Sequence, residues 1–418
     1  MANWITNRIK SNITIVKNAG YLSVIEVIRL AMPFIAIPYI ISTVGSSNYG
    51  LAVFSQTIIS YFTIFINWGL DVSAVKDVSV NRNDKDALNS IVSCVLGIKL
   101  ILFFLSFIIL LLCIWLVPFM REHYLLFLFA FITCISEVLF PVWFYQGIEK
   151  MKYLTLVRAS SILFYACSIF IFINDSEDYP KVVLLQSLGN VIASCFSAYL
   201  LFVVHKIKII KPGYQLLFST FKDSFPFFMS RLSVIFNNTM AKTLSGIFFT
   251  MEAVAAFDIA QKVATASLIP AQMLNVSVYP HIAKTKSKEF VRKYLKVNVL
   301  VSFATASVIA ILSSYIISVL SKNELTESVN LLRILCYWIF FGGITGYIGS
   351  PILVSFGYPK PFNISVILST ITLFILYCIS YIFDIFTIYN FAWILVISEF
   401  TILLYRLYYC IHLKLLTI

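Results

Sequence analysis

Charged side chains lie inside several long apolar stretches of this sequence, where lipid would leave them without partners. Glu26 and Arg29 are three residues apart in IEVIRLAMP, and Asp258 and Lys262 are four residues apart in FDIAQK. Residues at these spacings share one face of an α-helix. Each pair can therefore hold helices together or face a polar ligand, and both interpretations turn that face away from lipid.

Other charges are isolated within apolar stretches. Lys99, Arg231, Lys242 and Arg333 have no acid within one turn of their own helix, and Glu137 and Glu399 occupy further apolar stretches. Each would cost roughly 2.5–3.5 kcal/mol at the centre of a lipid-exposed helix. We therefore predict that they face a bundle interior or a wet cavity, while Arg333 is close enough to a segment end to reach the membrane surface.

The excess of cations in this set favours an anionic ligand, and the arginine fork suits phosphate because it donates to two oxygens at once. The predicted substrate-binding residues are Arg29, Arg231, Lys242, Lys262 and Lys99. The acids predicted to pair with them or to couple transport to protons or sodium are Glu26, Asp258, Glu137 and Glu399. Pro33, Pro38 and Pro270 interrupt apolar helices and are candidate hinges.

Composition places these residues in a membrane protein. The chain has 418 residues, of which 60% are hydrophobic and 12% are charged, against roughly 45–50% and about 25% in soluble domains. Its 31 Lys and Arg outnumber 19 Asp and Glu, a balance that would indicate nucleic acid for a soluble protein. Loop topology accounts for the excess in this chain, so we expect no nucleic-acid partner.

Hydropathy predicts an all-α polytopic membrane protein with about twelve spans of about 20 residues. They lie near residues 21–44, 50–70, 91–117, 123–145, 154–173, 182–204, 226–249, 252–280, 297–320, 329–355, 362–383 and 388–411. Basic residues gather between spans on one side, whereas the other side has only Arg121, Lys181 and Lys322. The positive-inside rule then places both termini in the cytoplasm.

The longest connection divides the spans into two equal sets. We predict an N-lobe with a short interfacial helix over 1–204, a cytoplasmic linker over 205–225 and a C-lobe over 226–418. An even number of spans in each lobe makes the two lobes a parallel repeat. YGLAVFSQT and VAAFDIAQK support this repeat, because their alignment matches Gln56 with Gln261.

The reactive side chains show no catalytic or metal-binding spacing. The eight cysteines lie in apolar segments without a CxxC pair, and the four histidines lie near predicted segment ends. This pattern predicts no disulfide framework, no metal site and no cofactor beyond a coupling ion. The short connections leave no room for a soluble catalytic domain, so we predict a transporter rather than an enzyme.

Three stretches resemble the Wzx-type O-antigen flippases, which are polysaccharide exporters of the multidrug/oligosaccharidyl-lipid/polysaccharide (MOP) superfamily. They are YGLAVFSQTIISYFTIFINWGLDVSAVKDVSVNRND (49–84), LFPVWFYQGIEKMKY (139–153) and PFFMSRLSVIFNNTMAKTLSGIFF (226–249). The similarity runs along the whole chain, and the run from Trp143 to Lys150 is its most specific part. It implies two six-helix lobes that form a V around a central cavity, in a bacterial inner membrane.

The resemblance also implies a function. It predicts outward transport of undecaprenyl-diphosphate-linked oligosaccharide by alternating access, with Arg29 and Arg231 engaging the diphosphate. Membrane lipid and other polysaccharide-assembly membrane proteins are the remaining expected partners. The alternatives are a multidrug/cation antiporter of the same superfamily, a membrane-embedded polysaccharide polymerase or acyltransferase, and a purely structural assembly partner.

Overall fold

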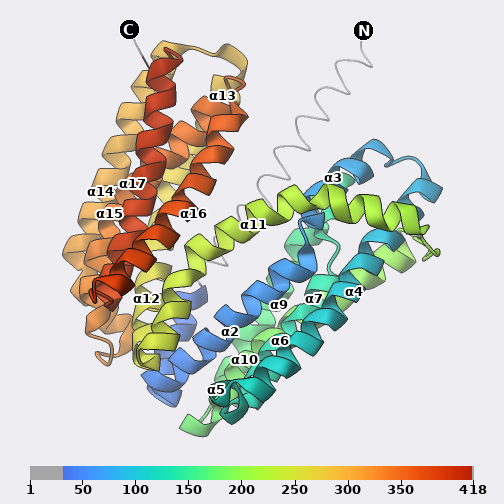
Figure 1. Ribbon diagram of the computed structural model, residues 1–418, viewed down its shortest axis with the longest axis horizontal. Coiled ribbons are helices and arrows are strands. Elements are labelled where there is room, and N and C mark those ends of the chain that lie inside the picture. The colour runs from blue at the N-terminus through green and yellow to red at the C-terminus, as the bar shows by residue number, and fades with distance from the viewer. Residues whose placement is uncertain (1–31, 417–418) are drawn as a thin grey trace. The chain divides into compact units, whose positions relative to one another are not determined.

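The computed structural model describes residues 32–416, which form helices joined by short connections (Figure 1). No strand occurs in this part of the chain. Nine of its helical segments are long and apolar enough to cross a membrane. The predicted all-α polytopic class is therefore confirmed. Glu26, Arg29 and the predicted interfacial helix lie outside the described residues.

The chain forms two compact units, and unit 1 comprises the residues up to Gly45 together with Ser55–Leu232. Two helices, α2 and α11, contribute to both units. The helices that lie at least partly in unit 1 are Met32–Val44, α2 (Ser46–Asn67), α3 (Leu70–Val80), α4 (Lys85–Leu116), α5 (Pro118–Glu122), α6 (Tyr124–Phe131), α7 (Thr133–Leu139), α8 (Val142–Gly147), α9 (Met151–Phe172), η1 (Ser176–Asp178), α10 (Tyr179–Tyr199), the π-helix η2 (Leu200–Val204) and α11 (Tyr214–Phe248).

A tryptophan at the break between α2 and α3 organises the core of unit 1. Trp68 has a left-handed backbone with φ 49°, which is strained for a bulky residue. Its ring stacks on both Phe221 and Phe228 of α11 at centroid distances of 4.3 Å, and its Nε1 donates to the Phe221 carbonyl at 3.0 Å. A Cβ on Gly69, which has φ 73°, would collide with the Phe228 backbone. Tertiary packing thus holds this turn in place.

The predicted span 123–145 is three short helices, α6, α7 and α8, rather than one. Helix α7 ends at Leu139, just before Pro141. Proline has no amide N–H, so Pro141 cannot donate to the carbonyl of Glu137 four residues earlier. The Glu137 carbonyl is therefore left open at the end of α7 and needs another donor.

Unit 2 comprises Ser46–Phe54 and Ser233–Ile418. Besides the parts of α2 and α11 that belong to it, its described helices are α12 (Met251–Ser267), α13 (Ile269–Thr285), α14 (Lys288–Ser321), α15 (Glu327–Tyr347), the π-helix η3 (Ile348–Val354), α16 (Pro359–Ile382) and α17 (Ile388–His412). One core cluster joins α13, α14, α15, η3 and α17, and Tyr347 and Ile282 lie fully buried in it. Helix α12 packs against α15 and is buried along Ala253–Ala260.

Two helix boundaries differ from the sequence prediction. The predicted span 252–280 is split at Leu268 into α12 and α13, each of 17 residues. Pro270 in the first turn of α13 cannot donate to the Ala266 carbonyl, which favours a break at this point. Helix α11 begins at Tyr214, inside the predicted linker 205–225, and continues through Pro226.

Close packing inside unit 2 gives a first prediction. A Cβ on Gly50 of α2 would overlap the carbonyl of Met251 at the start of α12. Gly50→Ala is therefore expected to lower the free energy of unfolding by about 1–3 kcal/mol, because backbone atoms on both sides must shift. Thermal unfolding in detergent measures this. Gly213→Ala is the control, since a Cβ at Gly213 meets nothing within 4 Å. An equal melting temperature for both variants would contradict the prediction.

Candidate functional site

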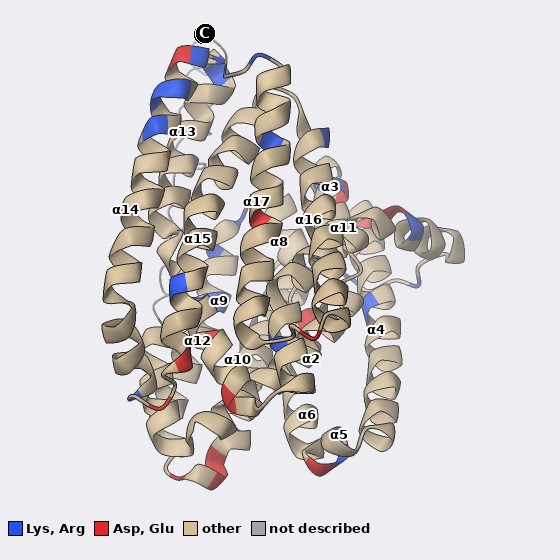
Figure 2. Ribbon diagram, turned by 60° about the vertical axis from the view of Figure 1, so that its left-hand side comes forward, with Lys and Arg blue, Asp and Glu red and all other residues tan. Residues whose placement is uncertain are grey.

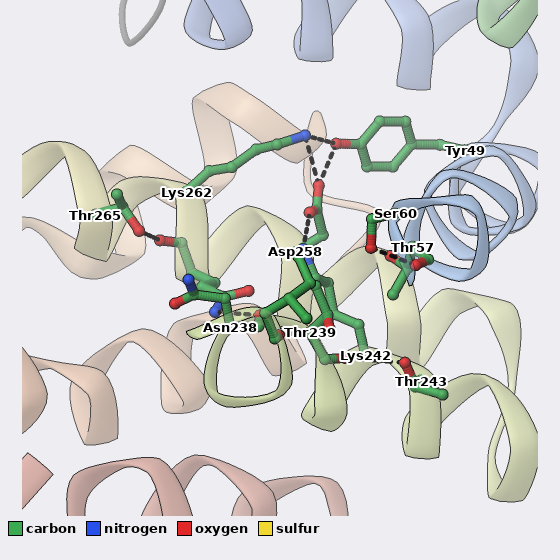
Figure 3. Close-up of polar contacts among 12 residues, drawn as sticks. Tyr49, Thr57, Ser60, Asn238, Thr239, Lys242, Thr243, Asp258, Lys262 and Thr265 are labelled. Carbon is green, nitrogen blue, oxygen red and sulfur yellow. Dashed lines mark hydrogen bonds and ion pairs between the residues drawn. The ribbon is translucent and has the colours of Figure 1, made fainter. Parts of the chain in front are cut away.

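A buried carboxylate in unit 2 holds two lysines that come from different helices (Figure 3). Asp258 of α12 has a side chain only 3% exposed. Its Oδ1 accepts from Lys242 Nζ of α11 at 3.1 Å, and its Oδ2 pairs with Lys262 Nζ at 2.7 Å. The spacing of four residues thus brings Asp258 and Lys262 together, as the sequence predicts. Lys242 shares the same carboxylate, a contact that the sequence does not indicate.

Tyr49 of α2 closes the group. Its hydroxyl donates to Asp258 Oδ2 at 2.7 Å and accepts from Lys262 Nζ at 3.0 Å. The Lys262 ammonium also lies 5.5 Å from the centre of the Tyr49 ring, within range of a cation–π contact. Tyr49 is buried, whereas the Lys262 side chain is 38% exposed. We call Tyr49, Lys242, Asp258 and Lys262 the Asp258 cluster. With two lysines and one carboxylate, it carries one excess positive charge, and Lys262 is its most accessible cation.

Unit 1 holds a second charged group, in which one buried lysine lies between two partly exposed acids. Lys99 of α4 is 1% exposed, and its Nζ lies 3.2 Å from Asp71 Oδ1 of α3 and 3.1 Å from Glu137 Oε1 of α7. The same ammonium donates to the Glu137 carbonyl at 3.0 Å. This carbonyl is the one that Pro141 leaves open. All three donors of the ammonium therefore have acceptors.

Asn67 completes this second group by donating to Glu137 Oε1 at 2.7 Å. We call Asn67, Asp71, Lys99 and Glu137 the Lys99 cluster. It contains two carboxylates and one ammonium, so its formal charge is one excess negative. Lys99 is thus enclosed by acids of its own unit, a geometry that suits a positioning role better than direct contact with an anion.

Two further in-membrane charges meet at Thr345 of α15. Glu399 of α17 accepts from the Thr345 hydroxyl, and Arg406 Nη1 donates to the Thr345 carbonyl at 2.7 Å. Arg406 also donates to Ser365 Oγ at 2.9 Å and lies over the Phe362 ring. Arg406 lies within the predicted span 388–411 and is buried in α17. These charges tie α15, α16 and α17 together.

The remaining predicted site residues lie apart from the two clusters. Arg231 of α11 is exposed, and no carboxylate of the described residues pairs with it. Arg333 of α15 donates to Ser313 and Ser314. Pro38 lies within the helix Met32–Val44 and Pro33 in its first turn. Figure 2 shows that the charges within the helices are few along long uncharged stretches.

The sequence analysis missed Asp71 because it placed this residue at the edge of the span 50–70. Helix α3 instead carries the chain on to Val80, and Ser46–Val80 forms one apolar segment. The available signal was the pattern of α3, in which Leu70, Ala74 and Val78 recur at helical spacing and are buried. That pattern extends a helix past Asp71 and would have brought it into the search for a partner of Lys99.

Comparison with known proteins decides the family. The family described as "Polysaccharide biosynthesis protein" matches residues 15–286, more than half of the chain. The chain belongs to the polysaccharide biosynthesis protein family. Both buried clusters, from Tyr49 to Lys262, lie inside the matched range.

Two relatives of this polysaccharide biosynthesis protein carry the name "Putative O-antigen transporter". The one from Escherichia coli (strain K12) is 25% identical over 356 residues, which are 83% of this chain and 85% of the relative. The one from Shigella dysenteriae is 23% identical over 282 residues, which are 66% of this chain and 69% of the relative. The similarity to O-antigen transporters therefore extends along most of the chain.

Solved structures of low sequence identity share the fold of this polysaccharide biosynthesis protein. "Lipid II flippase MurJ, inward closed conformation" matches with a TM-score of 0.75 at 13% identity, covering 93% of this chain and 86% of that one. An inward-facing multidrug resistance MATE family transporter of the MOP superfamily matches with a TM-score of 0.72 at 17% identity, covering 93% and 98%. These two likenesses show that the chain shares the fold of these proteins, and the family match and the two relatives confirm the resemblance to O-antigen exporters. The protein is a multi-pass protein of the bacterial inner membrane.

Proposed function

We propose that the protein is a flippase that moves a lipid-linked oligosaccharide across the inner membrane. Family membership carries this proposal, because the matching family is described as "Polysaccharide biosynthesis protein" and the two curated relatives are named "Putative O-antigen transporter". The likeness in fold to a lipid II flippase supports it. The proposed activity is transport rather than catalysis, and the proposed substrate is an undecaprenyl-diphosphate-linked oligosaccharide.

The charge of the Asp258 cluster supports an anionic substrate. One carboxylate cannot balance both Lys242 and Lys262, so a diphosphate that approaches Lys262 meets an uncompensated positive charge. The Tyr49 hydroxyl and Asp258 hold the Lys262 ammonium in place in the absence of substrate. Arg231 of unit 1 is exposed and has no acidic partner among the described residues, and it stays a predicted substrate contact in its own right.

The proposed direction is from the cytoplasmic to the periplasmic leaflet by alternating access. A membrane potential that is negative inside favours outward movement of an anion by about 2.3 kcal/mol per charge per 100 mV. Protons or sodium are the proposed coupling ions, and Glu137 in the Lys99 cluster is the proposed acid, because two carboxylates there share a single ammonium.

Proteoliposomes test the proposal directly. The purified protein is reconstituted with a fluorescent undecaprenyl-diphosphate-linked oligosaccharide, and an impermeant quencher reports how much of it reaches the outer leaflet. We expect flipping above the rate of protein-free liposomes. Lys262→Met is expected to slow it roughly 10- to 100-fold, the equivalent of one charge-assisted hydrogen bond of about 1.5–3 kcal/mol.

Two matched variants test whether a slower flipping rate comes from the lost charge of Lys262 or from a general effect of removing a lysine. Lys262→Arg keeps the positive charge and is expected to retain most of the rate, and Lys284→Met removes an exposed lysine at the end of α13 as a control. A wild-type rate no faster than protein-free liposomes would overturn the proposed function. A fully active Lys262→Met variant would remove Lys262 from the substrate site.

The second candidate function is an ion-coupled multidrug/cation antiporter. The excess negative charge of the Lys99 cluster and the similarity in fold to a MATE transporter favour it. Accumulation of a cationic dye in the same proteoliposomes under a proton or sodium gradient discriminates the two functions. Dye transport without movement of the lipid-linked oligosaccharide would support the antiporter.

A further inference from the structure

An apolar groove runs between α14 and α15 in unit 2. It has a volume of about 780 Å³, within the range of pockets that hold small molecules. Ala306, Ala310 and Cys336 are among its lining residues, and their small side chains leave room between larger neighbours. The Phe303 and Phe340 rings, 6.2 Å apart, form part of its wall. This surface suits a hydrocarbon chain, because its lining is almost entirely apolar.

Arg333 supplies a charge at this groove. Its Nε donates to Ser313 Oγ at 3.1 Å and its Nη2 to Ser314 Oγ at 3.3 Å. A guanidinium has five N–H donors, so these two bonds leave donors free. Arg333 is exposed, and it makes no ion pair with a carboxylate in the described part of the chain. An arginine that lies in an apolar face and has unused N–H donors favours a partner with an anionic oxygen.

A second hollow adjoins the groove towards the turn between α14 and α15. It has a volume of about 440 Å³ and shares Ser314 with the bonding partners of Arg333. Its lining is rich in hydroxyl and amide groups, namely Ser314, Ser318, Ser321, Asn323 and Thr326. An apolar groove, a guanidinium with donors to spare and a polar hollow thus follow one another along the same pair of helices.

We propose that this face binds one phospholipid with an anionic phosphodiester head. One of its acyl chains lies in the groove, its phosphate accepts from Arg333, and its polar head lies in the hollow near Ser318 and Thr326. One guanidinium balances the single negative charge of a phosphodiester, whereas a diphosphate would bring additional charge that no other cation lining either hollow offsets. The site is separate from the Asp258 cluster and does not depend on the proposed transport.

Phosphatidylglycerol is the probe for this site, with phosphatidylcholine as the neutral comparison. The full chain is purified in detergent with each lipid, and native mass spectrometry counts the lipid retained per protein. We expect one retained phosphatidylglycerol and little phosphatidylcholine. Arg333→Gln is expected to reduce phosphatidylglycerol retention roughly 10-fold or more, because it removes a charge-assisted contact.

Three further variants make the result decisive. Ala310→Trp fills the groove without changing charge and is expected to abolish retention, while Arg333→Lys keeps the charge and is expected to preserve much of it. Arg292→Gln removes a partly exposed arginine near the opposite end of α14 and is expected to have no effect. Equal retention of the two lipids, unchanged retention in Ala310→Trp, or displacement of phosphatidylglycerol by an undecaprenyl diphosphate at equal concentration would overturn the proposal.

Discussion

Asp258→Asn is expected to lower the free energy of unfolding by about 3–5 kcal/mol, the range observed when one partner of a buried ion pair is removed. The substitution leaves Lys242 and Lys262 near each other with no carboxylate between them. Their mutual repulsion adds to the loss of the hydrogen bond from Tyr49. Thermal unfolding in detergent and the flipping rate in proteoliposomes both measure the effect, and both are expected to fall.

A double variant provides the control for this prediction. Lys242→Met combined with Asp258→Asn restores the single excess positive charge of the natural cluster. We therefore expect the double variant to regain a large part of the stability that Asp258→Asn loses. A melting temperature of Asp258→Asn equal to that of the natural chain would show that the two lysines do not depend on this carboxylate.

Lys99→Met is expected to be at least as damaging, with a loss of about 3–5 kcal/mol. It removes the only cation that the structure places against Asp71 and Glu137 within the described part of unit 1. It also removes the donor to the Glu137 carbonyl, and this lost hydrogen bond is part of the expected loss. Chemical or thermal unfolding in detergent measures the loss.

The Lys99 cluster has two acids and one lysine, so removing one acid and removing the lysine are expected to have different effects on stability. Asp71→Asn leaves one lysine with one acid, so it is expected to cost far less than Lys99→Met. Lys181→Met removes an exposed lysine from its pair with Asp178 and is expected to cost far less than Lys99→Met. Similar losses in Lys99→Met and Asp71→Asn would contradict the proposed charge balance of the cluster.

Local periodicity predicted the fold class and part of the site. The membrane class follows from the long apolar stretches, and the pair of Asp258 and Lys262 follows from a spacing of four residues on one helix. The approach of Lys242 to Asp258 depends on how α11 packs against α12, which no local pattern encodes. The position of Tyr49 likewise depends on packing between distant segments.

Helix ends account for the other misses. Asp71 was placed at the edge of the span 50–70, whereas α3 runs to Val80 and carries Asp71 into contact with Lys99. Pro270 was predicted to interrupt the span 252–280, and in the structure this span is divided into two separate helices at Leu268. Sequence hydropathy finds apolar stretches reliably, but the ends of helices depend on prolines and on tertiary partners that hydropathy does not include.

The carbonyl that Pro141 leaves open has a consequence for motion. A helical segment interrupted by proline can usually bend at that point, because one backbone hydrogen bond is missing. In this protein the Lys99 ammonium of α4 donates to the open Glu137 carbonyl, and Asp71 and Glu137 hold the ammonium in place. The junction of α7 and α8 is thereby locked by a side chain from another helix, and we expect it to move as one rigid piece with α4 throughout the transport cycle.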